Sequence, residues 1–263
     1  MEELIIKPFE FTSRLNKYVL IPYYLDYLSS HSNLKEGLLD IQMKAFDQTL
    51  DFSSDIWAKD SSIKERIKGA KDIKEKISLQ YKTEIDNYFP ILFNQALIIS
   101  CTVFDLFLVE SLKTITEKQK NVLKMLANEE DITIGEIIDN NDYENIFSTI
   151  QNKVLKRFEF SSVEEKFKIF KKLGIDLGIV FELKLSKQEV RDKYPGGLSY
   201  LKEIYQIRNE IAHKNLLPIK TYEELSDIAF FLQSLILGLS YAIGDHFKIR
   251  TDIILMYQND IKK

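Results

Sequence analysis

The sequence predicts an all-α protein in which helices are joined by short turns. Only nine glycines and five prolines occur among 263 residues, which leaves little punctuation for a fold with many strands. Apolar residues recur at helical spacing through most of the chain, and the good helix formers Lys, Glu and Leu are abundant. With 45% hydrophobic residues, the chain is long and apolar enough to bury a sizeable core.

Residues 1–79 are expected to form an N-terminal helical extension. The composition changes from polar to apolar near Pro90, and this change favours a boundary between the extension and a domain of residues 80–263. The expected segments before it are an extended or irregular start (residues 1–12), helices over Leu15–Leu28 and Leu34–Phe52, and a polar helix from Ser61.

Residues 80–263 are expected to form a bundle around two apolar helices. Ile91–Ile115 is apolar almost all round, which is typical of a buried central helix. The final helix is also apolar, and Thr221 with Glu224 forms a capping box at its start. Further helices are expected from Thr116 to Ala127, over Tyr143–Phe158, from Ser161 or Ser162 (with Glu164 or Glu165 in the first turn) to a C-cap at Gly174, and from Ser199 to before Pro218.

Charge and cysteine content exclude several classes of protein. The net charge of −4 argues against a strongly basic protein that wraps a duplex, so any nucleic-acid contact must be a local patch. Cys101 is the single cysteine, which rules out an intramolecular disulfide and suggests a small core residue. The first residues lack a basic stretch followed by a long apolar one, so no signal peptide is expected and a cytoplasmic location is predicted.

Two apolar segments raise a membrane alternative. Ile228–Gly244 has no formal charge, but it is short for a span of about 20 residues and its flanks are acidic. The other segment, Ile91–Val109, carries Asp105 in its interior. Two such helices packed on each other form the core of a soluble bundle, so we expect no membrane insertion.

The segment Leu201–Asn215 (LKEIYQIRNEIAHKN) gathers three polar residues on a largely apolar helix: Arg208, Asn209 and His213. Asn209 and His213 share a face, whereas Arg208 lies about 140° from His213 around the helix. Histidine exchanges protons near neutral pH, and an arginine can bind two phosphate oxygens. These types suit phosphodiester cleavage; the structural alternative is a capping histidine with a structural arginine.

The sequence Arg208–His213 resembles the signature of HEPN domains, in which an arginine and a polar residue, often Asn, precede a histidine. The stretch Ser100–Leu112 resembles the early core helix of that family, with Asp105 at the position of its acidic residue. The resemblance covers about residues 80–263 and includes the segments Phe147–Leu155 and Glu165–Ile175 and the helix after Pro218.

The resemblance implies a HEPN-like antiparallel helical bundle that dimerises, so that two motifs line one composite active site. It implies a metal-independent endoribonuclease without cofactors that leaves a 2′,3′-cyclic phosphate, as in toxin–antitoxin or anti-phage systems. Arg208 and His213 become the catalytic pair, with Asn209 as a polar helper and Asp105 in support. The usual acidic residue is Glu, so Glu110 is the alternative to Asp105.

RNA, a second copy of the chain and an antitoxin or sensor protein are the partners that the resemblance implies. Lys202 and Lys214 lie near the motif in sequence and are weak candidates for RNA binding, since lysines on a helix face are usually just solvated. The alternative function is a non-catalytic HEPN-fold module that binds a nucleotide or a protein through the same cleft.

Overall fold

The structure is a computed structural model that describes residues 5–31, 88–128, 142–177 and 197–252, together with residues 36–37, 40, 43–44, 78, 133, 135–136 and 180. Within these residues the chain is mostly helical, which confirms the predicted all-α class. The helices are α1 (Pro8–His31), α5 (Tyr88–Lys118), α6 (Lys120–Leu126), α8 (Tyr143–Phe160), α9 (Val163–Lys172), α12 (Gly197–Lys214) and α13 (Tyr222–Phe247). The strands are β1 (Ile5–Ile6) and β2 (Arg250–Thr251).

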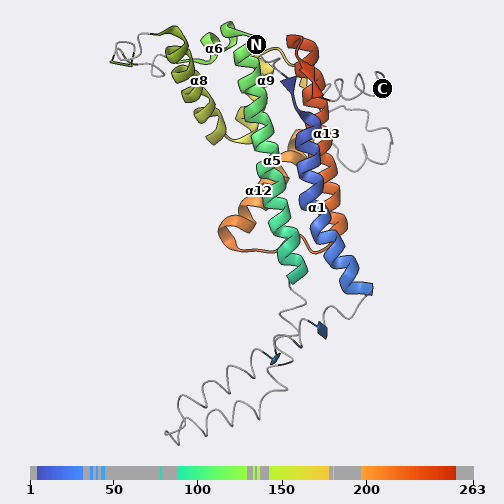
Figure 1. Cartoon of the computed structure of the whole chain (residues 1–263). Coiled ribbons are helices and arrows are strands. Elements are labelled where there is room, and N and C mark those ends of the chain that lie inside the picture. The colour runs from blue at the N-terminus through green and yellow to red at the C-terminus, as the bar shows by residue number, and fades with distance from the viewer. Residues whose placement is uncertain are drawn as a thin grey trace, which may run out of the picture.

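Three long helices, α1, α5 and α13, lie side by side and form the core (Figure 1). Their facing sides carry fully buried residues, among them Leu15 of α1, Leu97 and Leu108 of α5, and Leu232 and Leu239 of α13. Burying each such side chain contributes about 1.5–3 kcal/mol to folding. The expectation of two central apolar helices is therefore confirmed.

The described part of the expected N-terminal extension belongs to this core. Residues 5–31 include α1, which packs on both α5 and α13. The expectation of an extended or irregular start is confirmed for residues 5–7, which include β1, but α1 begins at Pro8, so the expectation was wrong for residues 8–12. Proline suits the first position of a helix, and the missing cap comes from the far end of the chain. The helices expected over Leu34–Phe52 and from Ser61 lie almost entirely outside the described residues.

The two ends of the described chain are tied together at the start of α1. Strands β1 and β2 pair in parallel, with Ile5 opposite Arg250 and Ile6 opposite Thr251. The Asp252 carboxylate then accepts the backbone N–H groups of Phe9 (3.1 Å) and Glu10 (3.2 Å). Asp252 thus satisfies first-turn amides that have no partner within the helix.

Local capping signals position the helices around the candidate site. At the start of α9 the capping box is formed by Ser162 with Glu165, one of the two pairs expected there, and Thr221 and Glu224 form the expected box of α13. Gly174 has a φ of 84° after α9, as a C-cap glycine requires. These three expectations are confirmed.

One helix boundary differs from the expected one. Thr116 does not begin a helix, because α5 continues to Lys118 and the Thr116 hydroxyl donates to the carbonyl of Lys113 inside α5 (2.8 Å). The next helix, α6, begins after Gln119, whose side chain makes no capping bond. Thr116 is fully buried and accepts a hydrogen bond from Gln151 of α8 (2.8 Å). Packing against α8 therefore keeps this residue in α5.

The connection between α12 and α13 is fastened to α5 by one buried side chain. The Asn94 amide donates to the carbonyl of Ile219 (2.7 Å), and its oxygen accepts the N–H of the same residue (3.2 Å). Asn94 is completely buried. These bonds satisfy the backbone N–H and C=O groups of Ile219, which lies outside any helix or strand. They therefore fix the position of the chain where it leaves the end of α12.

Among the described residues, α5 and α13 are long and apolar enough to cross a membrane by length and composition. Their most apolar windows are 56% and 67% buried inside the protein. Core helices of soluble proteins pass the same test, so this finding is weak evidence in either direction.

Candidate functional site

Helix α12 carries the motif and packs against α5 and α9. Leu201, Ile204 and Ile211 are buried and attach it to the core. The helix ends after Lys214, and Asn215 adopts a left-handed conformation with a φ of 52°. Asparagine tolerates this conformation at a helix end. The motif therefore lies in the last turns of a well-terminated helix.

Asn209 and His213 line one pocket of about 630 Å³, called the motif pocket below. Tyr205 lines it too, so the three residues follow the i, i+4, i+8 spacing of a single helix face. The opposite wall is the start of α9, including Ser162 and Glu164. His213 is exposed, which leaves its imidazole accessible to a ligand. The pocket combines a proton-exchanging group with an amide at neighbouring positions.

Arg208 lies beside this pocket rather than among the residues that line it. Its Nη1 donates to the Oδ1 of Asn209 (3.0 Å), so the guanidinium touches the pocket through that amide. The Nε of Arg208 is buried and has no hydrogen-bond partner in the part of the chain that the structure describes. Within one chain, Arg208 is therefore hydrogen-bonded to Asn209 but does not lie on the pocket wall that carries His213.

Behind the motif, a buried ion pair joins α5 to α9. The Nζ of Lys166 is 2.6 Å from Oδ1 of Asp105, and the two side chains are 3% and 26% exposed. The Lys166 ammonium also lies 5.9 Å from the centre of the Phe158 ring. Removing charges from water is costly, so the close contact with Asp105 is needed to hold Lys166 in place.

Lys166 is a residue that sequence reasoning missed. It follows Val163 by three residues and precedes Phe170 by four, so it occupies the buried face of α9 together with Phe167. A lysine on the apolar face of an amphipathic helix is the signal that could have identified it, because a buried charge requires a partner.

Asp105 and Arg208 act on the same neighbouring groups. Burial raises the pKa of the Cys101 thiol to about 12, with a further increase from Asp105 and an opposing effect of Arg208. Burial likewise raises the pKa of Tyr205 well above its usual value, with the Asp105 carboxylate as the next cause. Thiol and phenol thus stay protonated at neutral pH. Among the residues that the structure describes, the Tyr205 hydroxyl has no hydrogen-bond partner of good geometry.

The two acidic candidates occupy different places. Asp105 lies among Cys101, Tyr205 and Lys166, directly behind the motif helix. Glu110 is exposed and lines a separate pocket between α1 and α5. Of the two carboxylates, the structure brings only Asp105 to the motif.

The two candidate RNA-binding lysines both line the motif pocket, and each is paired with a carboxylate. Lys202 lies 3.3 Å from Glu164, and Lys214 lies 3.6 Å from Glu210. The lysine side chains are 48% and 64% exposed. Such exposed pairs are weak and exchange readily with solvent or a ligand. The pocket is thus balanced in charge, without a strong basic patch.

Of the histidines that the structure describes, His213 is the only one that lines the motif pocket. His246 belongs to α13 and packs against the ring of Phe247 and beside Gly174, away from the motif pocket. Among the described residues, no group of three or more His, Cys, Asp or Glu side chains could hold a metal ion.

Comparisons with models of protein families, with curated proteins and with solved structures find no match to this chain. The chemistry of the pocket, together with the motif, is therefore the basis for proposing a function.

Proposed function

We propose that the protein is a metal-independent endoribonuclease of the HEPN type that works as a homodimer. The observation that carries the proposal is the shared pocket of Asn209 and His213, with Arg208 hydrogen-bonded to Asn209. A histidine and an amide in one pocket, with a guanidinium hydrogen-bonded to the amide, can provide proton transfer and phosphate binding, which are two requirements of RNA cleavage through the 2′-hydroxyl.

In the proposed reaction, the 2′-oxygen of a ribose attacks the adjacent phosphorus while the bond from phosphorus to the 5′-oxygen breaks. His213 accepts the proton of the 2′-hydroxyl or donates a proton to the departing 5′-oxygen. Arg208 and Asn209 bind phosphate oxygens and stabilise the charge that grows on them. The products are a 2′,3′-cyclic phosphate and a 5′-hydroxyl.

The need for a dimer follows from the number of groups in one pocket. Cleavage uses one proton acceptor and one proton donor, whereas the pocket of one chain has a single histidine. Arg208 also lies off the wall that carries His213. A second motif facing the first would supply both the missing histidine and a guanidinium. Two copies of α12 therefore form the proposed composite site.

The proposed biological setting is a cytoplasmic toxin–antitoxin or anti-phage system, with an antitoxin or sensor protein as a further partner. Its support is the resemblance of Arg208–His213 to the HEPN signature.

The test is incubation of the purified full chain and its variants with total RNA, with and without EDTA. His213→Ala and Arg208→Ala are each expected to lower the cleavage rate at least about 100-fold, since both act on the reacting groups. Cleavage is expected to persist in EDTA and to leave DNA intact. His246→Gln is the matched control, a histidine change outside the pocket, and is expected to retain the parent rate.

Loss of cleavage in EDTA, or a parent rate in His213→Ala, would overturn the proposal. If the active protein sediments as a monomer, the proposal of a composite site is wrong.

The second candidate is a non-catalytic module that binds a nucleotide or a protein at the same pocket. It is favoured by the balanced charge around Lys202 and Lys214 and by the position of Arg208 beside the pocket. The results that would favour this second candidate are a parent protein that does not cleave RNA and a lower melting temperature in both Arg208→Ala and His213→Ala.

A further inference from the structure

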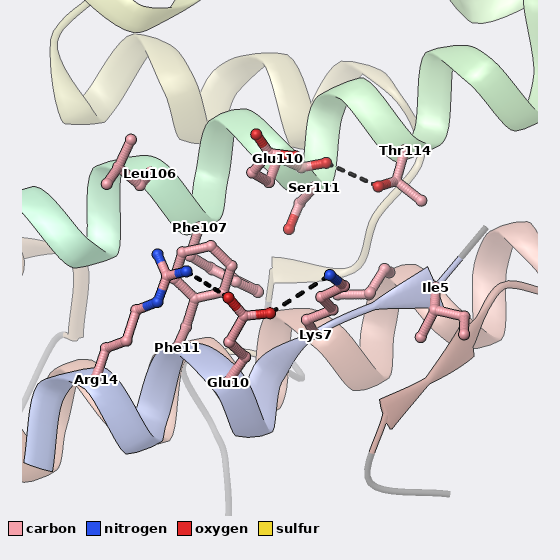
Figure 2. A pocket seen from close by; sticks show the side chains of 11 residues that line it. Ile5, Lys7, Glu10, Phe11, Arg14, Leu106, Phe107, Glu110, Ser111 and Thr114 are labelled. Atoms are coloured by element: carbon pink, nitrogen blue, oxygen red, sulfur yellow. Dashed lines mark hydrogen bonds and ion pairs between the residues drawn. The ribbon is translucent and has the colours of Figure 1, made fainter. Parts of the chain in front are cut away.

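A second pocket, of about 320 Å³, lies between α1 and α5 at the end where β1 enters the fold (Figure 2). This α1–α5 pocket is lined on one side by Lys7, Glu10 and Arg14 and on the other by α5, including Ser111. It shares no lining residue with the motif pocket. Its volume is at the lower end of the range for small-molecule sites.

The unusual group in this pocket is the hydroxyl of Ser111. The residue is only 2% exposed, yet its Oγ has no hydrogen-bond partner among the described residues. The other serines and threonines of α5 donate to a carbonyl of their own helix; they are Ser100, Thr102, Thr114 and Thr116. Figure 2 shows that the Ser111 hydroxyl points instead across the pocket towards α1.

A buried hydroxyl without a partner is rare, because its desolvation is not compensated. The Ser111 hydroxyl could rotate to donate to a carbonyl of its own helix, as that of Thr114 does, but it faces the pocket instead. The position of this hydroxyl therefore indicates an external polar atom inside the α1–α5 pocket.

On the α1 wall, Lys7 and Arg14 have more N–H donors than the carboxylate between them, Glu10, can accept. Glu10 lies between Lys7, at 3.5 Å, and Arg14. Lysine and arginine together carry more N–H donors than one carboxylate can accept. These side chains are between 38% and 61% exposed, so an incoming anion can reach them. Glu110 at the opposite rim is exposed as well. The α1 wall by itself carries a surplus of one positive charge, and Glu110 brings the formal charge of the whole lining to zero.

The first-turn amides of α1 do not add to this surplus, because Asp252 already accepts those of Phe9 and Glu10. Recognition must therefore come from side chains. The rest of the wall is apolar and includes the rings of Phe11 and Phe107, which meet edge to face at 5.5 Å between centroids. Ile5, Ile6 and Leu106 complete the apolar part of the lining.

We propose that the α1–α5 pocket binds a small organic anion with an apolar body. Its phosphate or carboxylate group contacts Lys7 and Arg14 and accepts the Ser111 hydroxyl, while its body lies against Phe11 and Phe107. Charge-assisted hydrogen bonds from lysine and arginine provide the attraction for the anionic group.

The test uses the full chain with phenyl phosphate and phenylacetate as probes, measured by calorimetry and by thermal shift. We expect saturable binding of at least one probe at one site per chain, with a rise in melting temperature. The two probes distinguish a phosphate site from a carboxylate site. Inorganic phosphate and phenol, which are the separate halves of phenyl phosphate, are expected to bind at least about tenfold more weakly.

Ser111→Ala and Arg14→Gln are each expected to weaken probe binding about tenfold, since each removes a donor to a charged group. Ser100→Ala is the matched control: it removes a buried hydroxyl of the same helix that bonds its own backbone. This control is expected to bind as the parent does. Ser111→Ala is also expected to keep the melting temperature of the unliganded protein, because its hydroxyl has no hydrogen-bond partner in the described part of the chain.

Absence of saturable binding by both probes would overturn the proposal. So would unchanged affinity in both Ser111→Ala and Arg14→Gln, or equal binding of phenol, which would show an apolar site only. None of these measurements involves RNA cleavage, so they stand or fall separately from the proposed nuclease.

Discussion

The two sides of α12 are built differently. The side towards α5 is closed: the Cys101 thiol is fully buried, and the Lys166 side chain, only 3% exposed, is paired with Asp105. The side that carries His213 is open, and its ion pairs lie in solvent.

This difference separates stability from function along one helix. Groups in the closed side depend on one another, because a buried charge without its partner is costly. Groups on the open side interact mainly with water and can exchange partners at little cost. Changes behind α12 should therefore alter folding, whereas changes in front of it should alter only what the pocket binds or cleaves.

The largest expected effect concerns the reactivity of Cys101. Its pKa is about 12 against an ordinary value of 9.0, so at pH 8 its thiolate fraction is about a thousandfold lower than in an unfolded chain. Labelling with a disulfide reagent should be at least about a thousandfold slower in the native protein than in guanidinium. The pKa is raised by folding, so its contribution to stability is present below pH 9 and is lost as the pH rises towards 12.

Rapid labelling of native Cys101 at pH 8 would show that the closed side opens readily. The unfolded protein, with its single thiol, is the internal control.

The second effect is on the free energy of unfolding. Lys166→Met leaves Asp105 without its cation, and we expect a loss of about 3 kcal/mol, or about 100-fold in the unfolding equilibrium. Denaturant titration measures it. The double change of Lys166→Met with Asp105→Leu should recover most of the loss, because it removes both charges together. A single variant as stable as the parent would contradict the closed-side description.

The smallest effect is expected on the open side. Lys214→Ala removes a pair with Glu210 in which the lysine is 64% exposed, and the unfolding free energy should change by less than about 0.5 kcal/mol. The same denaturant titration measures this change. A loss as large as that of Lys166→Met would show that the two sides of α12 do not differ as described.

The helices and their caps could be predicted from the sequence because their causes are local. The boxes of Ser162 with Glu165 and of Thr221 with Glu224 lie within four residues each. The end of α5 could not be predicted in this way, because Thr116 stays helical through its contact with Gln151 of another helix.

The same distinction holds for the candidate site. The shared face of Asn209 and His213 follows from their spacing, and the structure places both in one pocket. The contact of Lys166 with Asp105 spans 61 residues, so no local pattern predicts it. The position of Arg208 beside the pocket agrees with the angle of about 140° that helical spacing places between it and His213. Its hydrogen bond to Asn209 depends on a side-chain rotamer, which periodicity alone does not determine.

The capping of α1 by Asp252 also bears on how the protein is made. The two partners are 243 residues apart at Phe9, and a ribosome needs roughly 10–50 s to synthesise that length. During this time β1 and the first amides of α1 have no partner in the chain. Contacts of such long range form late in folding. The start of α1 is therefore expected to reach its final structure only after translation has passed Asp252, so a prematurely terminated chain would carry an incomplete first helix.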